Sequence, residues 1–568
     1  MEIDKKLVKI LKNISILLQI KGENVYKAKA YENAADIIES MQLDVADLVR
    51  KGKLGEIKGF GEALVKKITE YVESGKMSFY EKLISEIPVE LVAITRIPGI
   101  GPKKTKLLYD TLGIKTIDDL ENACAEGKVA KIKGFSPKSQ EIIYNSIQHI
   151  KAWKGKKHQI ACFQEANKIN LFLKSIPEVL DCSTVGEMRR YAEIVAQVHF
   201  LVSTDSPESI INHFEKNYQI HKNINLINFE TEDEIKVSIQ FTQPENYVWL
   251  LHNLTGTKEY ISAFANYFTE KLDIPFDFSN YPYKLKPLKT ENELFDLLDL
   301  QYIPPELREK PFAIFRAKEK SIPKLISEAD LKGMIHIHST WSDGFNTIEQ
   351  MAIASKNLGF EYIVICDHSQ TAKYANGLEP ERVIQQHKEI DELNEKNLGV
   401  KILKGIESDI LPDGSLDYDE DILKQFDVVV ASVHSHFKMT KDEMTRRIIY
   451  AIMSPYTHIL GHPTGRLILS RDSYEVDIKA IIDAAGDYGK IIELNANPYR
   501  LDLPWEYLLY AKEKGVKIAI NPDSHDTNSL TDIFYGVKFA RKGWLESKDV
   551  VNCLSYEKFI EYIKTIGK

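Results

Sequence analysis

The feature that most constrains this chain is a series of His, Asp and Glu motifs in its last third. Several motifs directly follow short apolar runs of strand-like composition, as at 362–366, 426–433 and 518–520. These runs alternate with helical stretches, which predicts βα units around a parallel sheet or barrel. Because the carboxyl ends of successive parallel strands meet at one mouth of a barrel, we expect the motifs to form one cluster there.

Nine residues make up this expected cluster. Two of them, His336 and His338, form an H-x-H pair whose imidazoles share one face if the strand alternates regularly. Nine ligands are too many for one tetrahedral zinc ion and suit two or three divalent ions with open positions. His387 lies in a charged helical run and is expected at the surface, whereas His436 and His458 are candidates for orienting ligands. The full set is His336, His338, Asp343, His368, Glu407, His434, His462, Asp523 and His525.

Three short glycine hairpins, at 57–61, 97–101 and 132–136, each precede a lysine-bearing helical pattern. A Gly-x-Gly turn that opens a helix directs backbone N–H groups outward at the positive end of the helix dipole, which suits a phosphate. Repeated three times, the pattern resembles helix-hairpin-helix elements, which hold nucleic-acid backbones without reading sequence. In the third hairpin Ser136 replaces the second glycine. The candidate DNA-binding residues are Gly59, Gly61, Gly99, Gly101, Lys103 and Gly134.

Charge and composition narrow the function further. Residues 1–160 hold 28 Lys and Arg against 21 Asp and Glu, so they carry +7 while the whole chain carries -9. A polyanion is therefore expected at the front of the chain. The 43% hydrophobic content excludes a disordered chain, and we find neither an apolar run of about 20 residues nor a signal peptide. Five scattered cysteines make disulfides and thiolate zinc sites unexpected, and a cytoplasmic protein is predicted.

The front of the chain is similar to a known family. The segment 21–31 and the hairpins together resemble the N-terminal domain of family X DNA polymerases. The resemblance implies that Lys67, at the position of a lysine that forms a Schiff base with an abasic sugar in some members, is a lyase candidate. A phosphate-contacting role for Lys67 stays open.

The resemblance continues into the middle region, where one part of the family's nucleotidyl-transfer motif is missing. Its glycine, two arginines and glutamate have counterparts in Gly186, Arg189, Arg190 and Glu193. Its three metal-binding aspartates are replaced by Gln197, His199 and Ser238. Two-metal phosphoryl transfer needs carboxylates, because Mg²⁺ demands hard anionic oxygens. We therefore expect a polymerase-like core that binds DNA or acts as a spacer and does not polymerise.

The His, Asp and Glu motifs resemble the PHP (polymerase and histidinol phosphatase) family over 333–568, with all nine ligand positions filled. Bacterial family X polymerases join a PHP domain to the polymerase core in this order, and 493–498 with Arg500 is similar to that subgroup. The resemblance implies a distorted (β/α)7 barrel and a 3′-to-5′ exonuclease, with activity on abasic sites or 3′-phosphates. Catalytic candidates are Glu407, Asp343 and His434, with Arg466 and Arg500 as phosphate clamps.

These expectations combine into a multi-domain α/β protein. We predict a helical lyase-like domain at 1–80, a helix-hairpin-helix, fingers-like domain at 81–150, a degenerate polymerase palm and thumb at 151–320, and a PHP barrel at 333–568. The proline-containing, charged stretch 303–332 has the composition of a linker.

The predicted function is metal-dependent hydrolysis of DNA in repair, by a monomer that acts on gapped, nicked or single-stranded ends. Imidazole and carboxylate ligands accept Mn²⁺, Zn²⁺ or Fe²⁺, so the metal stays open. Three other functions also stay open: an active family X polymerase, a small-molecule phosphatase, and a non-catalytic DNA-binding scaffold. The basic hairpins disfavour the phosphatase, and the filled ligand set disfavours the scaffold.

Overall fold

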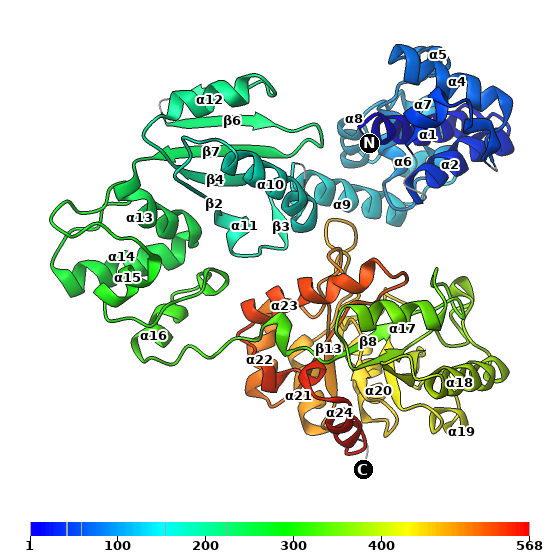
Figure 1. Ribbon diagram of the computed structural model, residues 1–568. Coiled ribbons are helices and arrows are strands. Elements are labelled where there is room, and N and C mark those ends of the chain that lie inside the picture. The colour runs from blue at the N-terminus through cyan, green and yellow to red at the C-terminus, as the bar shows by residue number, and fades with distance from the viewer. Residues whose placement is uncertain (1, 41–43, 58, 154, 224, 567–568) are drawn as a thin grey trace. The chain divides into compact units, whose positions relative to one another are not determined.

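The chain forms two compact units, Met1–Lys154 and Gly155–Lys568 (Figure 1). The computed structural model describes residues 2–40, 44–57, 59–153, 155–223 and 225–566. Within these ranges, no helix has the length and apolar character needed to cross a membrane.

The first unit is helical and has two hydrophobic cores. Leu7, Leu11 and Ile14 of the first helix are buried at helical spacing in one core, and Leu108 and Ile147 lie in the other. Its helices are α1 (Glu2–Lys21), α2 (Val25–Ser40), α3 (Val45–Arg50), η1 (Leu54–Glu56), α4 (Glu62–Ser74), α5 (Ser78–Glu86), α6 (Leu91–Thr95), α7 (Pro102–Leu112), α8 (Ile117–Ala125), η2 (Val129–Lys131) and α9 (Pro137–Trp153).

The three glycine hairpins are copies of one turn. In each, a backbone N–H three residues into the turn donates to a carbonyl, from Phe60 to Ile57, Ile100 to Ile97 and Phe135 to Ile132, at 2.9–3.1 Å. Gly59, Gly99 and Gly134 have φ values of 104°, 83° and 101°, which glycine adopts without a Cβ penalty. In the third copy the Ser136 hydroxyl accepts from the backbone N–H of Ser139, 3.1 Å away, and so caps α9. The predicted repeat is thus present three times.

The second unit begins with an α/β domain built on a five-stranded sheet in the order β2-β4-β7-β6-β5. Only the β4–β7 pair is parallel. The elements are β1 (Lys157–His158), α10 (Gln159–Lys174), β2 (Asp181–Val185), α11 (Gly186–Arg189), β3 (Ile194–Val195), β4 (Val198–Ser203), α12 (Pro207–Glu215), β5 (His221–Asn223), β6 (Leu226–Glu230) and β7 (Lys236–Thr242).

A helical subdomain follows this sheet, and it includes most of the stretch predicted as a linker. It contains α13 (Pro244–Thr255), α14 (Lys258–Leu272), α15 (Glu291–Leu297), η3 (Pro305–Leu307), α16 (Phe312–Lys318) and η4 (Glu328–Asp330). Ile303, Leu307 and Ala317 are buried with Trp249 and Phe264 in one core. The linker prediction for 303–332 is therefore wrong, because apolar residues of this stretch pack in a core and two of its charged residues, Glu306 and Arg308, are buried as well.

The remainder is a seven-stranded parallel sheet in the sequential order β8 to β14, with helices around it (Figure 1). Ile337, in β8, and Ser524, after β14, form a parallel bridge, so the sheet nearly closes. The predicted barrel is confirmed. Its strands are β8 (Gly333–Ile337), β9 (Tyr362–Ile365), β10 (Lys401–Asp409), β11 (Val428–Ser432), β12 (Ile459–Leu460), β13 (Ile491–Asn495) and β14 (Ile518–Asn521). Its α-helices are α17 (Ile348–Asn357), α18 (Pro380–Glu395), α19 (Glu420–Leu423), α20 (Lys441–Met453), α21 (Ile478–Asp487), α22 (Leu508–Glu513), α23 (Asp532–Lys542) and α24 (Tyr556–Ile563), and the 3-10 helix η5 (Lys373–Ala375) lies after β9.

Candidate metal centre

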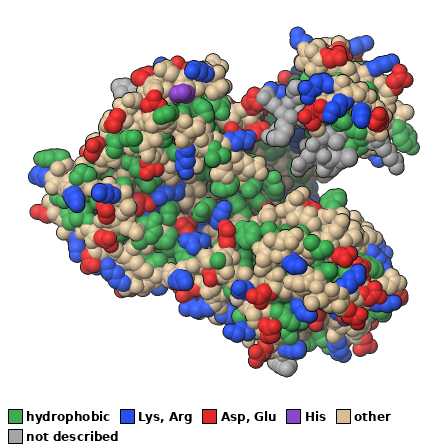
Figure 2. Space-filling view, in the orientation of Figure 1, with side chains coloured by type: hydrophobic (Ala, Val, Ile, Leu, Met, Phe, Trp, Pro, Cys, Tyr) green, Lys and Arg blue, Asp and Glu red, His purple; other side chains and the backbone are tan. Residues whose placement is uncertain are grey.

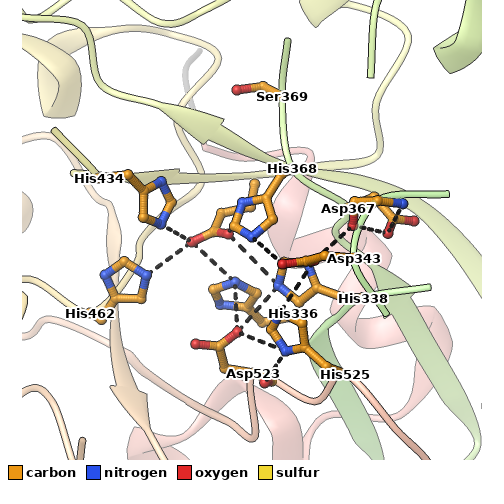
Figure 3. A network of polar contacts seen from close by, with 12 residues as sticks. His336, His338, Asp343, Asp367, His368, Ser369, His434, His462, Asp523 and His525 are labelled. Carbon is orange, nitrogen blue, oxygen red and sulfur yellow. Dashed lines mark hydrogen bonds and ion pairs between the residues drawn. The ribbon is translucent and has the colours of Figure 1, made fainter. Parts of the chain in front are cut away.

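The predicted cluster lies at the carboxyl ends of the barrel strands, as Figure 3 shows. His336 lies in β8, where it has φ +63°, and the pairing of β8 with β9 shifts register between Met334 and Ile337. The ring centroids of His336 and His338 are 5.3 Å apart, so the H-x-H pair meets through a bulge rather than regular alternation. Asp523, after β14, also has a positive φ of 53°. Backbone strain of this kind concentrates at functional sites.

Glu407, in β10, is the centre of the cluster. Its Oε1 lies 3.0 Å from His462 Nε2, 3.2 Å from His434 Nε2 and 3.3 Å from His336 Nε2. Its Oε2 lies 2.9 Å from His368 Nδ1. One buried carboxylate thus faces four imidazoles from four other strands, which is an arrangement suited to bridging cations.

The other side of the cluster is more open to solvent. Asp343 lies 3.4 Å from His525 Nε2 and 3.7 Å from His368 Nε2, and Asp523 Oδ1 lies 3.2 Å from His338 Nε2. The Asp343 side chain is 35% exposed, whereas that of His338 is fully buried. The cluster therefore opens at Asp343.

The donor atoms fit divalent ions. Three overlapping groups have ligand atoms within 4.8 Å of one another: His338, Asp343, His368 and His525; His336, His338 and Glu407; and His368, Glu407 and His434. Among the described residues, His336 Nε2 and both ring nitrogens of His338 are buried and form no hydrogen bond of normal geometry. Carboxylate oxygens nevertheless lie 3.2–3.3 Å from the two Nε2 atoms. Buried polar atoms normally have partners, so these nitrogens are placed as ligands would be.

The electrostatics of the cluster favour a cation. Burial alone would raise the pKa of Glu407, but His434 and other imidazoles outweigh it and hold that pKa well below its usual range. Burial would lower the pKa of His434, but Glu407 and Asp409 raise it to about 10. Burial and the neighbouring His525 lower the pKa of His338 to about 3. The central carboxylate is therefore anionic at neutral pH.

Two buried carboxylates that sequence analysis did not single out orient histidines of the cluster. Glu493 Oε2 lies 2.6 Å from His336 Nδ1, and Asp409 Oδ1 lies 2.5 Å from His434 Nδ1. A carboxylate on one ring nitrogen fixes the tautomer and directs the other nitrogen toward a metal. The signal was present in the sequence, because Glu493 is an acid inside the apolar run 491–494.

Asp367 is a third such carboxylate and anchors the loop that carries Asp343. It is fully buried. It accepts hydrogen bonds from the backbone N–H and hydroxyl groups of Ser339 and Ser342, at 2.5–3.1 Å, and from the Gln386 amide at 2.6 Å. These bonds hold the loop from 339 to 343 over the end of β9.

The structure gives the two candidate phosphate clamps different surroundings. Arg500 Nε lies 3.9 Å from Asp523 Oδ2, at the edge of the cluster. Arg466 instead binds Glu193 at 2.5 Å and donates to the carbonyl oxygens of Arg500 and Leu501. Its guanidinium is engaged within the chain, where it supports the backbone that carries Arg500.

The remaining histidines also differ from expectation. His387 is buried and packs edge-on against Phe426, with ring centroids 5.0 Å apart, so its predicted surface position is wrong. His458 precedes β12 and accepts a hydrogen bond from the Val429 N–H, which places it at the opposite ends of the strands from the cluster. His436 is exposed beside Ser435.

The positions of the missing polymerase aspartates also come together. His199 in β4 pairs with Ser238 in β7, and both line a cavity of about 370 Å³ with Gln197, Gly186 and Arg190. Burial lowers the pKa of His199, which favours a neutral imidazole. The lining supplies no carboxylate at any of the three aspartate positions.

Each charged residue retained from the nucleotidyl-transfer motif has a partner within the chain. Arg189 forms a two-pronged ion pair with Glu291 at 2.7 and 3.1 Å. Arg190 binds Glu309 at 3.1 Å, and Glu193 binds Arg466. These residues therefore contribute to the fold whether or not the cavity acts on nucleotides.

In the first unit, Lys67 lies on α4 beside two aromatic rings. Its Nζ is 4.7 Å from the Phe79 ring centroid and 5.7 Å from that of Tyr31, and these rings stack 5.8 Å apart. Its Nζ also donates to the Ala63 carbonyl at 3.3 Å. Figure 2 shows Lys and Arg side chains of this unit interspersed with acidic ones.

Comparison with known proteins bears on the whole chain. It is 35% identical over 571 residues, 99% of both chains, to the DNA polymerase/3′-5′ exonuclease PolX of Bacillus subtilis (strain 168). The chain belongs to the PolX family. A probable phosphatase of Thermoanaerobacter sp. (strain X514) is 32% identical over 240 residues, which is 40% of this chain and 93% of the relative. The resemblance to bacterial family X polymerases with a C-terminal PHP domain is confirmed.

Family models match three segments of this PolX member. A helix-hairpin-helix domain matches residues 4–77, a SAM-like helix-hairpin-helix tandem matches 91–148, and a PHP domain matches 335–497. The PHP match ends before Asp523 and His525, which the fold nevertheless places in the same cluster.

Proposed function

We propose that this PolX member is a DNA-binding, metal-dependent phosphodiesterase that removes nucleotides from the 3′ end of DNA. One observation carries the proposal: nine His, Asp and Glu side chains meet at the barrel mouth of a chain that also has three helix-hairpin-helix turns. The metal site accounts for the hydrolytic chemistry, and the repeated turns account for a nucleic-acid substrate.

We propose that the nine residues hold two or three divalent ions, of Mn²⁺, Zn²⁺ or Fe²⁺. When bound, such ions would activate a water and neutralise charge on the phosphoryl group. Glu407 supplies the anionic centre that collects them. Asp409 and Glu493 hold His434 and His336 in their ligand orientations, and Arg500 is positioned to bind the phosphate beside Asp523.

The test is digestion of DNA labelled at either end, combined with metal analysis of the same preparation. We expect stoichiometric divalent metal and stepwise shortening from the 3′ end, and both should disappear after chelation. Hydrolysis of small phosphomonoesters by a protein that leaves DNA intact would instead favour the small-molecule phosphatase. This is the second candidate because shorter relatives are named probable phosphatases.

We further propose that the polymerase-like core does not transfer nucleotides, because no carboxylate occupies the three aspartate positions that line the cavity. Purified protein with dNTPs, Mg²⁺ and a primed template should leave the primer unextended. Template-dependent extension would show that substitute ligands suffice.

The proposal also covers the residues of the first unit that bind DNA. The glycines at 59, 61, 99, 101 and 134 and Lys103 contact the DNA backbone. Lys67 either contacts a phosphate or forms a Schiff base with an abasic sugar, and borohydride trapping on an abasic oligonucleotide distinguishes the two.

We propose a cytoplasmic monomer with domains at 1–80, 81–150, 151–320 and 333–568 that acts on gapped, nicked or single-stranded ends. Sedimentation and limited proteolysis test the monomer and the boundaries.

A further inference from the structure

The barrel mouth carries two unusually exposed aromatic side chains. Phe345 is 80% exposed and Tyr374 is 74% exposed, more than any other large hydrophobic residue described between 333 and 566. Single exposed aromatics are ordinary on protein surfaces. These two differ because both lie beside the metal cluster.

The Phe345 backbone and the Tyr374 ring lie on either side of the open part of the cluster. The Phe345 backbone N–H donates to the carbonyl of His525 at 2.7 Å, and the Tyr374 ring centroid is 6.1 Å from that of His368. Asp343 lies between these two histidines, 3.4 Å from one and 3.7 Å from the other. A phosphate that reached Asp343 would therefore lie between the residue that carries the Phe345 ring and the ring of Tyr374.

The loops that carry the rings are fixed rather than free. A Cβ at Gly344 would lie 2.8 Å from the Ser339 backbone, so only glycine allows the tight turn before Phe345. After Tyr374, the Asn376 amide donates to the carbonyl oxygens of Trp341 and Ser342 at 3.1 and 3.3 Å, which ties the two loops together. The fold thus holds the backbone beneath both exposed rings at defined positions.

We propose that Phe345 and Tyr374 stack against the two bases that flank the phosphodiester at the cluster; this rests on the proposed nuclease function. Every internucleotide phosphate lies between two nucleosides, so a site that admits the phosphate receives one base on either side. In a duplex the faces of these bases are covered by their neighbours. The rings therefore select an unpaired, splayed DNA end, without preference for base identity.

The experiment compares full-length Phe345→Ala and Tyr374→Ala with wild type on two single-stranded oligonucleotides. One has ordinary bases throughout, and the other has abasic tetrahydrofuran residues on both sides of the terminal phosphodiester. Each alanine variant should lower kcat/KM on the ordinary strand by about 5- to 150-fold, the range of one base–aromatic stack. On the abasic strand, wild type and variants should be equally slow.

Three controls make the result specific. Tyr488→Ala removes another exposed aromatic, in the segment that leads into the amino end of β13, and should behave as wild type on both strands. Tyr374→Phe should keep most activity, because the ring rather than the hydroxyl carries the effect. The preference of wild type for single-stranded over blunt duplex ends should shrink in both alanine variants.

The outcomes separate this inference from the function on which it rests. A wild-type protein that cleaves no DNA end overturns both. If wild type cleaves and the alanine variants match it, the stacking role is wrong and the rings serve another partner. Equal losses on the ordinary and abasic strands would also overturn it, because the substitutions would then act on the metal site.

Discussion

Two sites in this chain each gather polar side chains from neighbouring strands. They differ in the ligand atoms that these side chains offer to a metal ion. In the cavity of the α/β domain, side chains from β4 and β7 meet, and Gln197, His199 and Ser238 occupy the positions where the family resemblance leads us to expect aspartates. At the barrel mouth, the nine expected ligands form one cluster with Glu407 at its centre. The cavity lining includes Glu187 but has no carboxylate at the three expected aspartate positions, whereas Glu407 lies at the centre of the barrel cluster.

The retained residues of the first site explain why its framework persists. Arg189, Arg190 and Glu193 all form ion pairs within the chain. A side chain with a partner in the fold is costly to replace whatever the site does, because the partner would be left unpaired. Replacing a carboxylate whose partner is a bound ion leaves no side chain of the fold unpaired, so it does not carry this cost. A framework therefore persists where its residues serve the fold.

The largest expected effect concerns the barrel. Replacing His336 and His338 together by Ala, or Asp343 by Asn, should lower DNA hydrolysis by more than about 100-fold and reduce bound metal. Loss of a direct ligand exceeds the roughly 10–100-fold cost of losing a residue that only orients one. Metal analysis and end-labelled digestion measure the two effects. DNA affinity, measured by filter binding, should change little.

The contrast between the two sites would fail if the double histidine variant kept its full metal content and near-normal digestion. The metal and the activity would then lie elsewhere in the chain.

The second prediction tests the structural role of the retained arginines. Replacing Glu291 by Gln should destabilise the α/β domain and the helical subdomain by about 3–5 kcal/mol. The fully buried Arg308 and the partly buried Arg189 would both lose their counter-charge. Urea unfolding followed by tryptophan fluorescence gives the change. DNA hydrolysis below the transition should stay normal.

The same ion pairs give this effect a pH dependence. Burial would raise the pKa of Glu291, but Arg308 and Arg189 outweigh it and lower the pKa to about 2. The stabilisation is therefore complete above the ordinary carboxyl pKa of 4.5 and is lost as the pH falls toward 2. The stability difference between wild type and Glu291→Gln should shrink over that interval, and a constant difference would contradict the assignment.

The third prediction concerns the carboxylates behind the ligands. Glu493→Gln keeps the shape of the side chain but removes the negative charge beside His336 Nδ1. Metal affinity or activity should therefore fall about 10–100-fold. Glu475→Gln, at an exposed position of the same domain, is the matched control. A loss as complete as that of the double histidine variant would make Glu493 a ligand itself.

The barrel site was largely predictable because its signals are local. Each motif follows its own apolar run, and parallel strands bring their carboxyl ends together without further information. The three hairpins were predictable for the same reason, since each turn is encoded within five residues. What the motifs did not reveal were the orienting roles of Asp367, Asp409 and Glu493.

Features that depend on distant partners could not be read from the sequence. Arg466 is a candidate phosphate clamp, and its contact with Glu193, which lies 273 positions away, was not predicted. The charged and proline-containing composition of 303–332 concealed Ile303 and Leu307, which pack in a core with Trp249. His387 lies in a charged helix, yet the ring turns inward against Phe426. In each case the tertiary contact decides the role.

A smaller effect is expected in the first unit. Lys103, exposed in the first turn of α7, should contribute one phosphate contact, so Lys103→Ala should flatten the dependence of log K on log salt by about 0.9 on duplex DNA. Lys82→Ala, exposed on α5 outside the hairpins, should leave the slope unchanged. Equal slopes for wild type and Lys103→Ala would remove this lysine from the interface.

The smallest effect is expected at the degenerate cavity itself. Gln197→Ala and His199→Ala should leave both DNA hydrolysis and the absence of primer extension unchanged, because neither side chain supplies the anionic oxygen that Mg²⁺ needs. Both residues line the cavity, and Gln197→Ala would remove the side-chain hydrogen bond from Gln197 to Asn228, 3.3 Å long. If wild type extends the primer and either substitution abolishes that extension, an amide or an imidazole takes over the role of the aspartates. The two sites would then differ in ligand type rather than in activity, and the comparison drawn from their carboxylates would fail.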